Sequence, residues 1–227
     1  MSAVTPVIED VTTMTAPAIV LDAVVSVVDG FPLLAGVNLV VHEGEVVLVS
    51  GPNGAGKTSL LRLVAGLLPV TEGRAEVLGT DLAVAPRAHR GHVALVGQET
   101  GCYDDLSVTR NLALHARAAG LPSTQVERIM RLLELDDIAS VPHGRLSTGQ
   151  RRRCALAVGL ARDARLLLLD EPHAGLDARA RDVVDRAVRA AFNAGTTVLL
   201  VSHELDRARA LAHREIQLAG GCVVTSF

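Results

Sequence analysis

Short runs of apolar residues recur along this chain of 227 residues, and most of them end at glycine or at a polar residue. The runs lie at 19–28, 37–41, 46–49, 93–96, 166–169 and 197–201. The first two are rich in β-branched residues and are separated by Gly30, Pro32 and Gly36, which predicts strands joined by turns. The third run is short and continuous, which is typical of a buried central strand. Residues 57–68 predict a helix that stops before Pro69.

Polar residues follow the later apolar runs directly. Gly97 and Gln98 follow 93–96, Asp170 follows 166–169, and Ser202 and His203 follow 197–201. Strands that alternate with helices predict an α/β fold with a mostly parallel sheet. Ligands of such sheets bind at the carboxyl ends of the strands, so these polar residues are candidates for a site.

The pattern becomes helical after Gln98, without convincing strands. The predicted helices lie at 108–119 and 125–135. We interpret the segment of about 99–160 as a helical insert in a single domain that spans 19–227. Residues 1–18 have neither a basic nor an apolar region, so they predict a flexible tail rather than a signal peptide.

Composition narrows the classes of function. The chain has 22 basic and 25 acidic residues, a net charge of −3, and only 2% aromatic residues, which argues against a nucleic-acid partner. No apolar run approaches the ~18–20 residues that span a bilayer, so any membrane role is expected to come through a partner. The cysteines lack metal-ligand spacing and predict reduced, mostly buried thiols, which fits a cytoplasmic protein. These are Cys102, Cys154 and Cys222.

A glycine-rich segment follows the third apolar run and opens the predicted helix. It reads Gly51-Pro52-Asn53-Gly54-Ala55-Gly56-Lys57-Thr58, which fits the pattern G-x-x-x-x-G-K-[ST]. Its glycines let backbone N–H groups converge on phosphate oxygens, and the helix N-terminus adds partial positive charge. Lys57 is expected to reach the terminal phosphates of a bound nucleotide, Thr58 to ligate Mg²⁺, and Ser59 to lie at the same nucleotide site. The context between strand and helix disfavours a glycine turn without function.

An acidic pair follows the leucines at 166–169. Asp170 ends a predicted buried strand, where it is expected to hold Mg²⁺ directly or through water. In phosphoryl transfer the protein mainly positions groups and stabilises charge. We therefore predict that Glu171 is the general base or orients the attacking water. An acidic pair in isolation is usually solvated surface, but the leucines and the upstream phosphate loop favour a site.

The segment Leu146-Ser147-Thr148-Gly149-Gln150 supports two interpretations. Ser147 and Gln150 fit a capping box that starts a helix reaching Ala161. A helix start with an exposed glycine, here Gly149, is also an anion-binding site. The two interpretations are compatible, because capping leaves other N–H groups free.

Taken together, the motifs occur in a specific order along the chain. The order is the phosphate loop, Gln98 after a strand, Leu-Ser-x-Gly-Gln, Asp-Glu-Pro, Gly175-Leu176-Asp177 and Val201-Ser202-His203. This order resembles that of the ATP-binding-cassette (ABC) ATPases over about 19–224. The resemblance implies a P-loop NTPase fold with a mostly parallel central sheet, an N-terminal antiparallel β portion and a helical subdomain. It also implies ATP and Mg²⁺ as cofactors.

The resemblance further implies that two ATP molecules lie head to tail between two such domains, in a homodimer or a heterodimer. Ser147, Gly149 and Gln150 of one domain would then complete the ATP site of the other, with Ser147 and Gly149 at its γ-phosphate. Asp177 resembles the residue that links the two sites across the dimer.

Two further residues gain a role from the resemblance. Gln98 is similar to the glutamine that contacts Mg²⁺ and senses the transporter. His203 is similar to the histidine that contacts the γ-phosphate. From the residues alone, His203 is a polar residue at a strand end, and a single histidine is more often structural than catalytic.

The chain departs from the family pattern at the adenine. Members usually carry an aromatic residue that stacks on the base, and the corresponding position here is Val28. Phe31 is the only nearby ring, three residues later. Adenine recognition is therefore expected to be weaker or differently built. Thr148 replaces a frequent glycine at a variable position of the signature motif, where it should be tolerated.

The sequence indicates less directly which kind of system the ATPase serves. Only 49 residues separate Gln98 from Ser147, which leaves no room for the long coiled coils of chromosome-structuring relatives. A single small cassette most simply serves transmembrane transporter subunits, at the inner face of the cell membrane. The stretch 96–112 resembles the ATPase subunit of haem exporters in cytochrome c maturation. The alternatives are a soluble assembly ATPase resembling the iron–sulfur scaffold cassette, and a small-molecule P-loop kinase, which leaves the signature motif unexplained.

Overall fold

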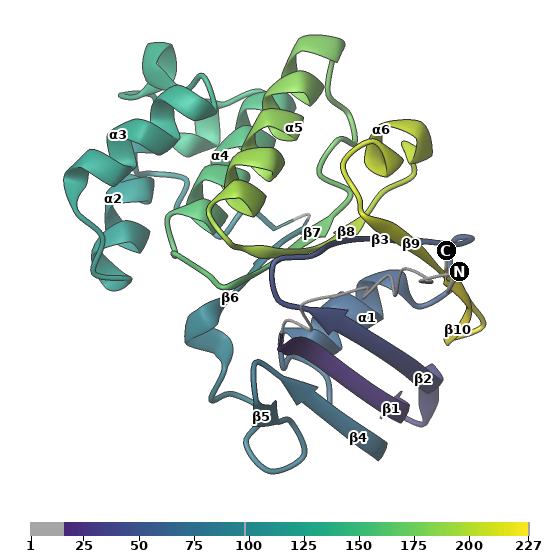
Figure 1. Ribbon diagram of the computed structural model, residues 1–227. Coiled ribbons are helices and arrows are strands. Elements are labelled where there is room, and N and C mark those ends of the chain that lie inside the picture. The colour runs from purple at the N-terminus through teal and green to yellow at the C-terminus, as the bar shows by residue number, and fades with distance from the viewer. Residues whose placement is uncertain (1–15, 98, 227) are drawn as a thin grey trace, which may run out of the picture.

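The computed structural model describes residues 16–97 and 99–226, whose strands form two sheets (Figure 1). The central sheet has six strands in the order β10-β9-β3-β8-β7-β6. They are β3 (Val46–Ser50), β6 (Val93–Val96), β7 (Leu166–Asp170), β8 (Thr197–Val201), β9 (Arg214–Ala219) and β10 (Cys222–Ser226). All neighbours in it pair in parallel except β9 and β10. The expected α/β class with a mostly parallel sheet is confirmed.

An antiparallel sheet accounts for the expected N-terminal β portion. Its order is β2-β1-β4-β5, with β1 (Pro17–Val28), β2 (Phe31–His42), β4 (Glu72–Val77) and β5 (Thr80–Asp81). The helices are α1 (Lys57–Val64), α2 (Val108–Ala118), α3 (Ser123–Leu132), α4 (Thr148–Leu160), α5 (Ala178–Asn193) and α6 (Leu205–Arg209). Short 3₁₀ turns are η1 (Arg90–His92), η2 (Asp136–Ile138) and η3 (His143–Arg145).

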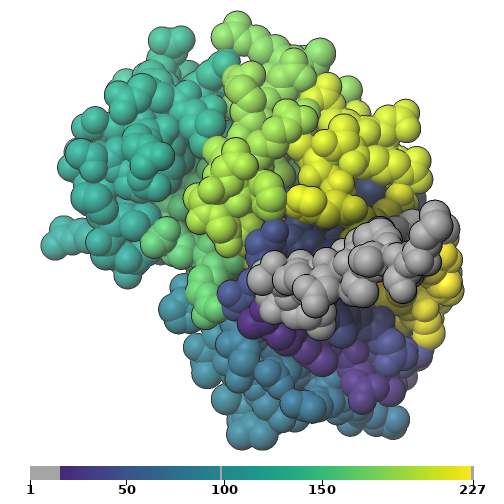
Figure 2. Space-filling view, in the orientation of Figure 1, coloured from purple at the N-terminus to yellow at the C-terminus, as the bar shows by residue number. Residues whose placement is uncertain are grey.

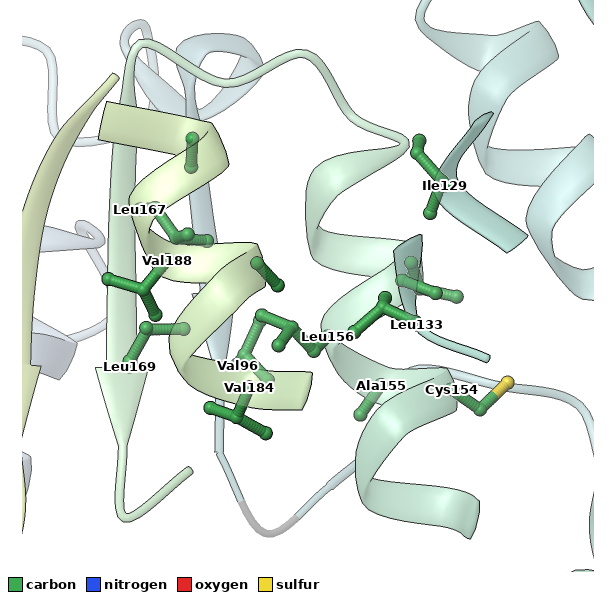
Figure 3. Close-up of a cluster of buried hydrophobic side chains, with 14 of the residues drawn as sticks. Val96, Ile129, Leu133, Cys154, Ala155, Leu156, Leu167, Leu169, Val184 and Val188 are labelled. Carbon is green, nitrogen blue, oxygen red and sulfur yellow. The ribbon is translucent and has the colours of Figure 1, made fainter. Parts of the chain in front are cut away.

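Four strands of the central sheet, β3, β6, β7 and β8, are apolar on both faces, because the sheet separates two cores. In β3, Val46 and Leu48 pack with the helices α2 to α5, whereas Val47 and Val49 pack with α1 and the antiparallel sheet. The same alternation runs through β7 and β8. Figure 3 shows Leu167 and Leu169 of β7 beside Val184 and Val188 of α5. Strands buried on both faces require continuous apolar runs, which is the pattern in the sequence.

The first hairpin differs from its prediction. β1 begins at Pro17, so the last two residues of the expected tail belong to the strand, and β2 begins at Phe31 rather than at 37. A two-residue turn at Asp29 and Gly30, both with positive φ, joins the strands directly. Pro32 is compatible with β2 because β2 is an edge strand of its sheet.

Two helices end where the chain enters a left-handed conformation. α1 ends at Val64 and not at 68, because Gly66 has φ +70° and the N–H of Leu67 donates back to the carbonyl of Arg62. α3 ends at Leu132 and not at 135, because Glu134 has φ +51°. Both prediction errors have the same cause, a backbone reversal that apolar periodicity does not record.

The segment between β6 and β7 carries α2, α3 and α4 and forms a lobe at the upper left of Figure 2, across the central sheet from the antiparallel sheet. Its close packing against the central sheet depends on Gly159 of α4, where an added Cβ would lie 2.5 Å from Cγ2 of Val96. That this lobe is a subdomain of its own remains a prediction. No helix among the described residues is both long and apolar enough to cross a membrane.

Candidate functional site

The phosphate loop joins the end of β3 to the start of α1, as the sequence predicts. Gly51 has φ +136°, and a Cβ there would lie 2.1 Å from the carbonyl oxygen of Leu218 in β9, so only glycine fits. Gly56 is the N-cap of α1 and supplies no side-chain cap. The first N–H groups of α1 therefore remain available at the positive end of the helix dipole, which is the arrangement that binds phosphate.

Lys57 is buried beneath this loop. Its Nζ donates to the carbonyl oxygens of Gly51, at 2.7 Å, and Pro52, at 2.9 Å. An ammonium group has three donors, so one remains for an anion above the loop. The geometry fits a lysine that is held by the loop and neutralises bound phosphate.

Thr58 and Asp170 are 112 residues apart in the sequence and lie together in the fold. The hydroxyl of Thr58 donates to Oδ2 of Asp170 at 2.8 Å. Neighbouring ligands in an octahedral Mg²⁺ shell with bonds of 2.0–2.1 Å lie about 2.9 Å apart. These two oxygens are thus spaced as adjacent Mg²⁺ ligands, so the residues present fit this ion.

Glu171 and His203 meet at the carboxyl ends of β7 and β8. The N–H of Glu171 donates to the carbonyl of Val201 at 2.9 Å, and the N–H of His203 donates to Oε2 of Glu171 at 3.0 Å. The other oxygen, Oε1, lies 3.4 Å from Nε2 of His203 and has no hydrogen-bond partner in the described part of the chain. Glu171 also lines the cavity of the phosphate loop, where a carboxylate is able to accept a proton from water.

The backbone at Glu171 is strained, with φ +53° in a residue that is not glycine. Such conformations cost of order 1–3 kcal/mol and persist where the surrounding structure enforces them. Arg152 of α4 provides part of that support, because it donates to the carbonyl oxygens of Glu171 and Gly97, both at 2.8 Å. Burial lowers the pKa of Arg152, while the carboxylates of Asp170 and Glu171 act in the opposite direction.

Arg152 is a residue that the sequence reasoning missed as part of this site. It is the middle one of three consecutive arginines, 151–153, which are all half-buried and donate to backbone carbonyl oxygens, so the sequence does not reveal which of them contacts the site. The contact also joins α4, which begins at the signature motif, to the peptide of the predicted catalytic residue.

One cavity of about 440 Å³ collects the phosphate-loop residues with Asp170, Glu171 and His203. Pro32 and Leu33 at the start of β2 line its other side. The neighbouring Phe31 is 73% exposed, whereas Val28, the position expected to face the base, is half-buried. The ring of Phe31 is therefore exposed next to residues that line the cavity, where it is accessible to the base of a bound nucleotide.

The signature motif lies elsewhere on the surface. The capping box is present, with the Ser147 hydroxyl accepting from the N–H of Gln150 at 3.3 Å and the Gln150 amide oxygen accepting from the N–H of Ser147 at 2.9 Å. Neither these residues nor Gly149 line the cavity of the phosphate loop. Asp177 caps α5 by accepting from the N–H of Ala180 at 2.8 Å. Gln98, predicted to contact Mg²⁺, lies outside the described residues.

The sequence of this chain is similar to those of known proteins. A family model described as "ABC transporter" matches residues 34–174. A daunorubicin resistance ATP-binding protein of Streptomyces coeruleorubidus is 40% identical over 80% of this chain. A Fe³⁺ ion import ATP-binding protein of Streptomyces coelicolor is 38% identical over 87% of it. The chain spans 58% of the length of each of these two relatives.

A solved structure gives a further similarity. It is a dimeric ATP-binding cassette in a post-hydrolysis state with ADP and phosphate bound. It is 26% identical to this chain, with a TM-score of 0.83 over 92% of this chain and 97% of that one. The match therefore extends beyond the phosphate loop to the whole arrangement of sheets and helices.

Proposed function

This chain belongs to the ABC transporter family of ATPases, and on that premise we propose that it hydrolyses ATP as the peripheral subunit of a membrane transporter. The observation that carries the proposal is the division of the motifs between two surfaces. The phosphate loop, Asp170, Glu171 and His203 line one cavity, while the signature motif lies outside it. A second copy or a related domain is needed to bring a signature motif to the nucleotide.

Within one ATP site, the chain's own residues have distinct roles. Lys57 and the N–H groups of α1 bind the β- and γ-phosphates, and Thr58 and Asp170 hold Mg²⁺, with Gln98 as a further ligand. When bound, Mg²⁺ neutralises phosphate charge. Glu171 orients the attacking water with its carboxylate, and His203 contacts the γ-phosphate. The strained peptide of Glu171 keeps this carboxylate pointed into the cavity.

The signature residues act across the dimer. Ser147 is exposed, and a Cβ at Gly149 would meet only Cδ2 of Leu176, at the ordinary contact distance of 3.5 Å. The packing of this chain therefore does not require glycine at position 149. A requirement for glycine would come from a group outside the chain, and a phosphate bound by the partner domain fits the positive helix end.

Mixing two inactive variants tests this proposal. Ser147→Arg should retain ATP binding by the monomer and lose turnover, whereas Lys57→Ala should lose binding. In mixed homodimers one composite site holds both lesions and the other is whole, so part of the activity should return. A Ser147→Arg protein that hydrolyses ATP at the normal rate would leave the motif as a helix cap only.

We propose transmembrane subunits as the partners and the inner face of the cell membrane as the location. The relatives named above serve drug resistance and iron import, so neither a cargo nor a direction follows from them. A haem-type exporter is the specific system that the stretch 96–112 favours. Copurification of the tagged chain from detergent extracts tests the class of partner. Recovery of a helix-rich membrane protein supports transport, whereas recovery of soluble assembly factors would support the iron–sulfur scaffold alternative.

A further inference from the structure

Two cysteines that are 52 residues apart in the sequence lie together in the fold. Cys102 lies in the segment between β6 and α2, and Cys154 lies in α4, with 3.7 Å between their sulfur atoms. Both are free thiols. Figure 3 shows the Cys154 sulfur on the side of α4 that is turned away from β7. A disulfide has an S–S length of about 2.05 Å, so the two sulfurs need to approach by roughly 1.7 Å.

From this juxtaposition we propose that Cys102 and Cys154 are a site of reversible oxidative modification, at which a hydroperoxide introduces a disulfide. Disulfides that form in reducing compartments are usually transient and redox-sensing. The segment of Cys102 is neither helix nor strand, so it is the part that supplies the approach.

The two thiols differ in the way that the reaction requires. The hydrogen bond with Cys154 lowers the pKa of Cys102, and the same bond together with burial raises the pKa of Cys154. Of the two thiols, Cys102 is therefore the one that loses its proton more readily. Cys102 is half-buried and lines an open groove of about 990 Å³, whereas Cys154 is fully buried, so a small oxidant reaches Cys102 first.

The chemistry is balanced with a hydroperoxide as the only oxidant. The Cys102 thiolate attacks the terminal peroxide oxygen, the O–O bond breaks, and the alkoxide leaves with a proton as alcohol, or as water from hydrogen peroxide. The product is a sulfenic acid on Cys102. The sulfur of Cys154 then attacks it, the S–O bond breaks, and hydroxide leaves as water with the proton of Cys154. A dithiol reductant reverses the product by exchange.

The crosslink would restrain the helix that carries the signature motif. Arg152 already links α4 to Gly97, and the disulfide would add a covalent tie between α4 and the same segment. The groove beside Cys102 is also lined by Ser147 and Thr148 at the start of α4. This effect on turnover rests on the proposed closure of the signature motif over the partner's ATP, and we expect a drop of several-fold.

Peptide mapping of the oxidised full chain tests the site without relying on activity. The chain is treated with hydrogen peroxide, alkylated without reductant and digested with trypsin. The expected product is a linked pair of the peptides 91–110 and 154–162, which separate after dithiothreitol. Cys102→Ser should abolish the link, while Cys222→Ala, the matched control, should keep it.

The outcomes separate the parts of the proposal. Oxidation of Cys102 to sulfinic acid without any link, or a link that involves Cys222, would overturn the site. A link that forms while ATP turnover stays unchanged would overturn the restraint of α4. If the reduced protein has no turnover at all, the proposed function fails, but the mapping result still decides the disulfide.

Discussion

Gly149 offers a test in which stability and activity should change in opposite directions. It is the second residue of α4, and its backbone is not in the left-handed region, so alanine can adopt its conformation. A Cβ would meet Leu176 at 3.5 Å, which is an ordinary contact. Replacement of glycine by alanine at a compatible site stabilises a protein by about 0.4–1 kcal/mol. For a chain of this size, the midpoint of thermal unfolding should rise by roughly 1–4 °C.

Turnover of Gly149→Ala should fall for a reason that lies outside the chain. If Gly149 packs against the γ-phosphate of the partner site, the added methyl group overpacks the closed dimer, at a cost of about 1–3 kcal/mol. Closure would then weaken by roughly 5- to 150-fold, because each 1.4 kcal/mol is a factor of ten. ATP binding to the monomer should not change.

The assays are thermal unfolding of the nucleotide-free protein, titration of the monomer with ATP, and steady-state hydrolysis at a concentration that supports dimers. Thr148→Ala is the matched control, because Thr148 is exposed at the preceding position of α4 and is expected to be tolerated. Normal turnover by Gly149→Ala would refute a role of the motif at a second nucleotide. A lower unfolding midpoint would refute the inference that a methyl group fits beside Leu176 without strain.

Three further predictions concern the nucleotide cavity. Glu171→Gln should keep ATP affinity, lose most hydrolysis and accumulate an ATP-bound dimer; near-normal turnover would contradict the proposed role. Arg152→Met removes two hydrogen bonds from a charged donor and should lower kcat at least tenfold. It should also lower the free energy of unfolding by about 2–4 kcal/mol, because such bonds contribute roughly 1.5–3 kcal/mol each and the half-exposed position of Arg152 reduces their sum. The exposed Arg162→Met is its control, and equal kcat values for the two would exclude a supporting role. Phe31→Ala should weaken ATP binding if the Phe31 ring stacks on adenine, because base–aromatic stacking contributes roughly 1–3 kcal/mol per base to binding in nucleic-acid complexes. Equal ATP affinity of Phe31→Ala and the unchanged chain in a titration would show that Phe31 does not contact the base.

The parts of the fold that the sequence predicted well are those where one local signal suffices. In the central sheet, β3, β6, β7 and β8 are continuous apolar runs, and the phosphate loop has a fixed spacing between a strand and a helix. β9 was not predicted, because Arg214, Glu215 and Gln217 interrupt its apolar pattern. β4 was not predicted, because Glu72–Val77 contains three charged residues and is a strand through its pairing with β1 and β5. The end of α3 was missed because Glu134 takes a conformation that is uncommon outside glycine.

The site was predictable to the same extent. Lys57, Thr58, Asp170 and Glu171 follow from motifs, and the structure places them in one cavity. The support of Glu171 by Arg152 and the pairing of Cys102 with Cys154 depend on contacts between distant segments. No periodicity or spacing in a single sequence reports such contacts, so only the folded arrangement reveals them.

The four leucines of β7 have a consequence for how the strand finds its alignment. Because both faces of the strand carry leucine, a shift of one residue against β8 would exchange leucine for leucine, and the apolar pattern alone would hardly oppose it. A shift toward the start of β8 would draw Asp170 into the interior, where an unpaired carboxylate is strongly disfavoured. It would also separate the Asp170 oxygen from the hydroxyl of Thr58. Asp170 therefore disfavours a shifted pairing of β7 with β8 during folding. Replacing Asp170 with leucine would remove both a proposed metal ligand and the residue that disfavours the shifted register.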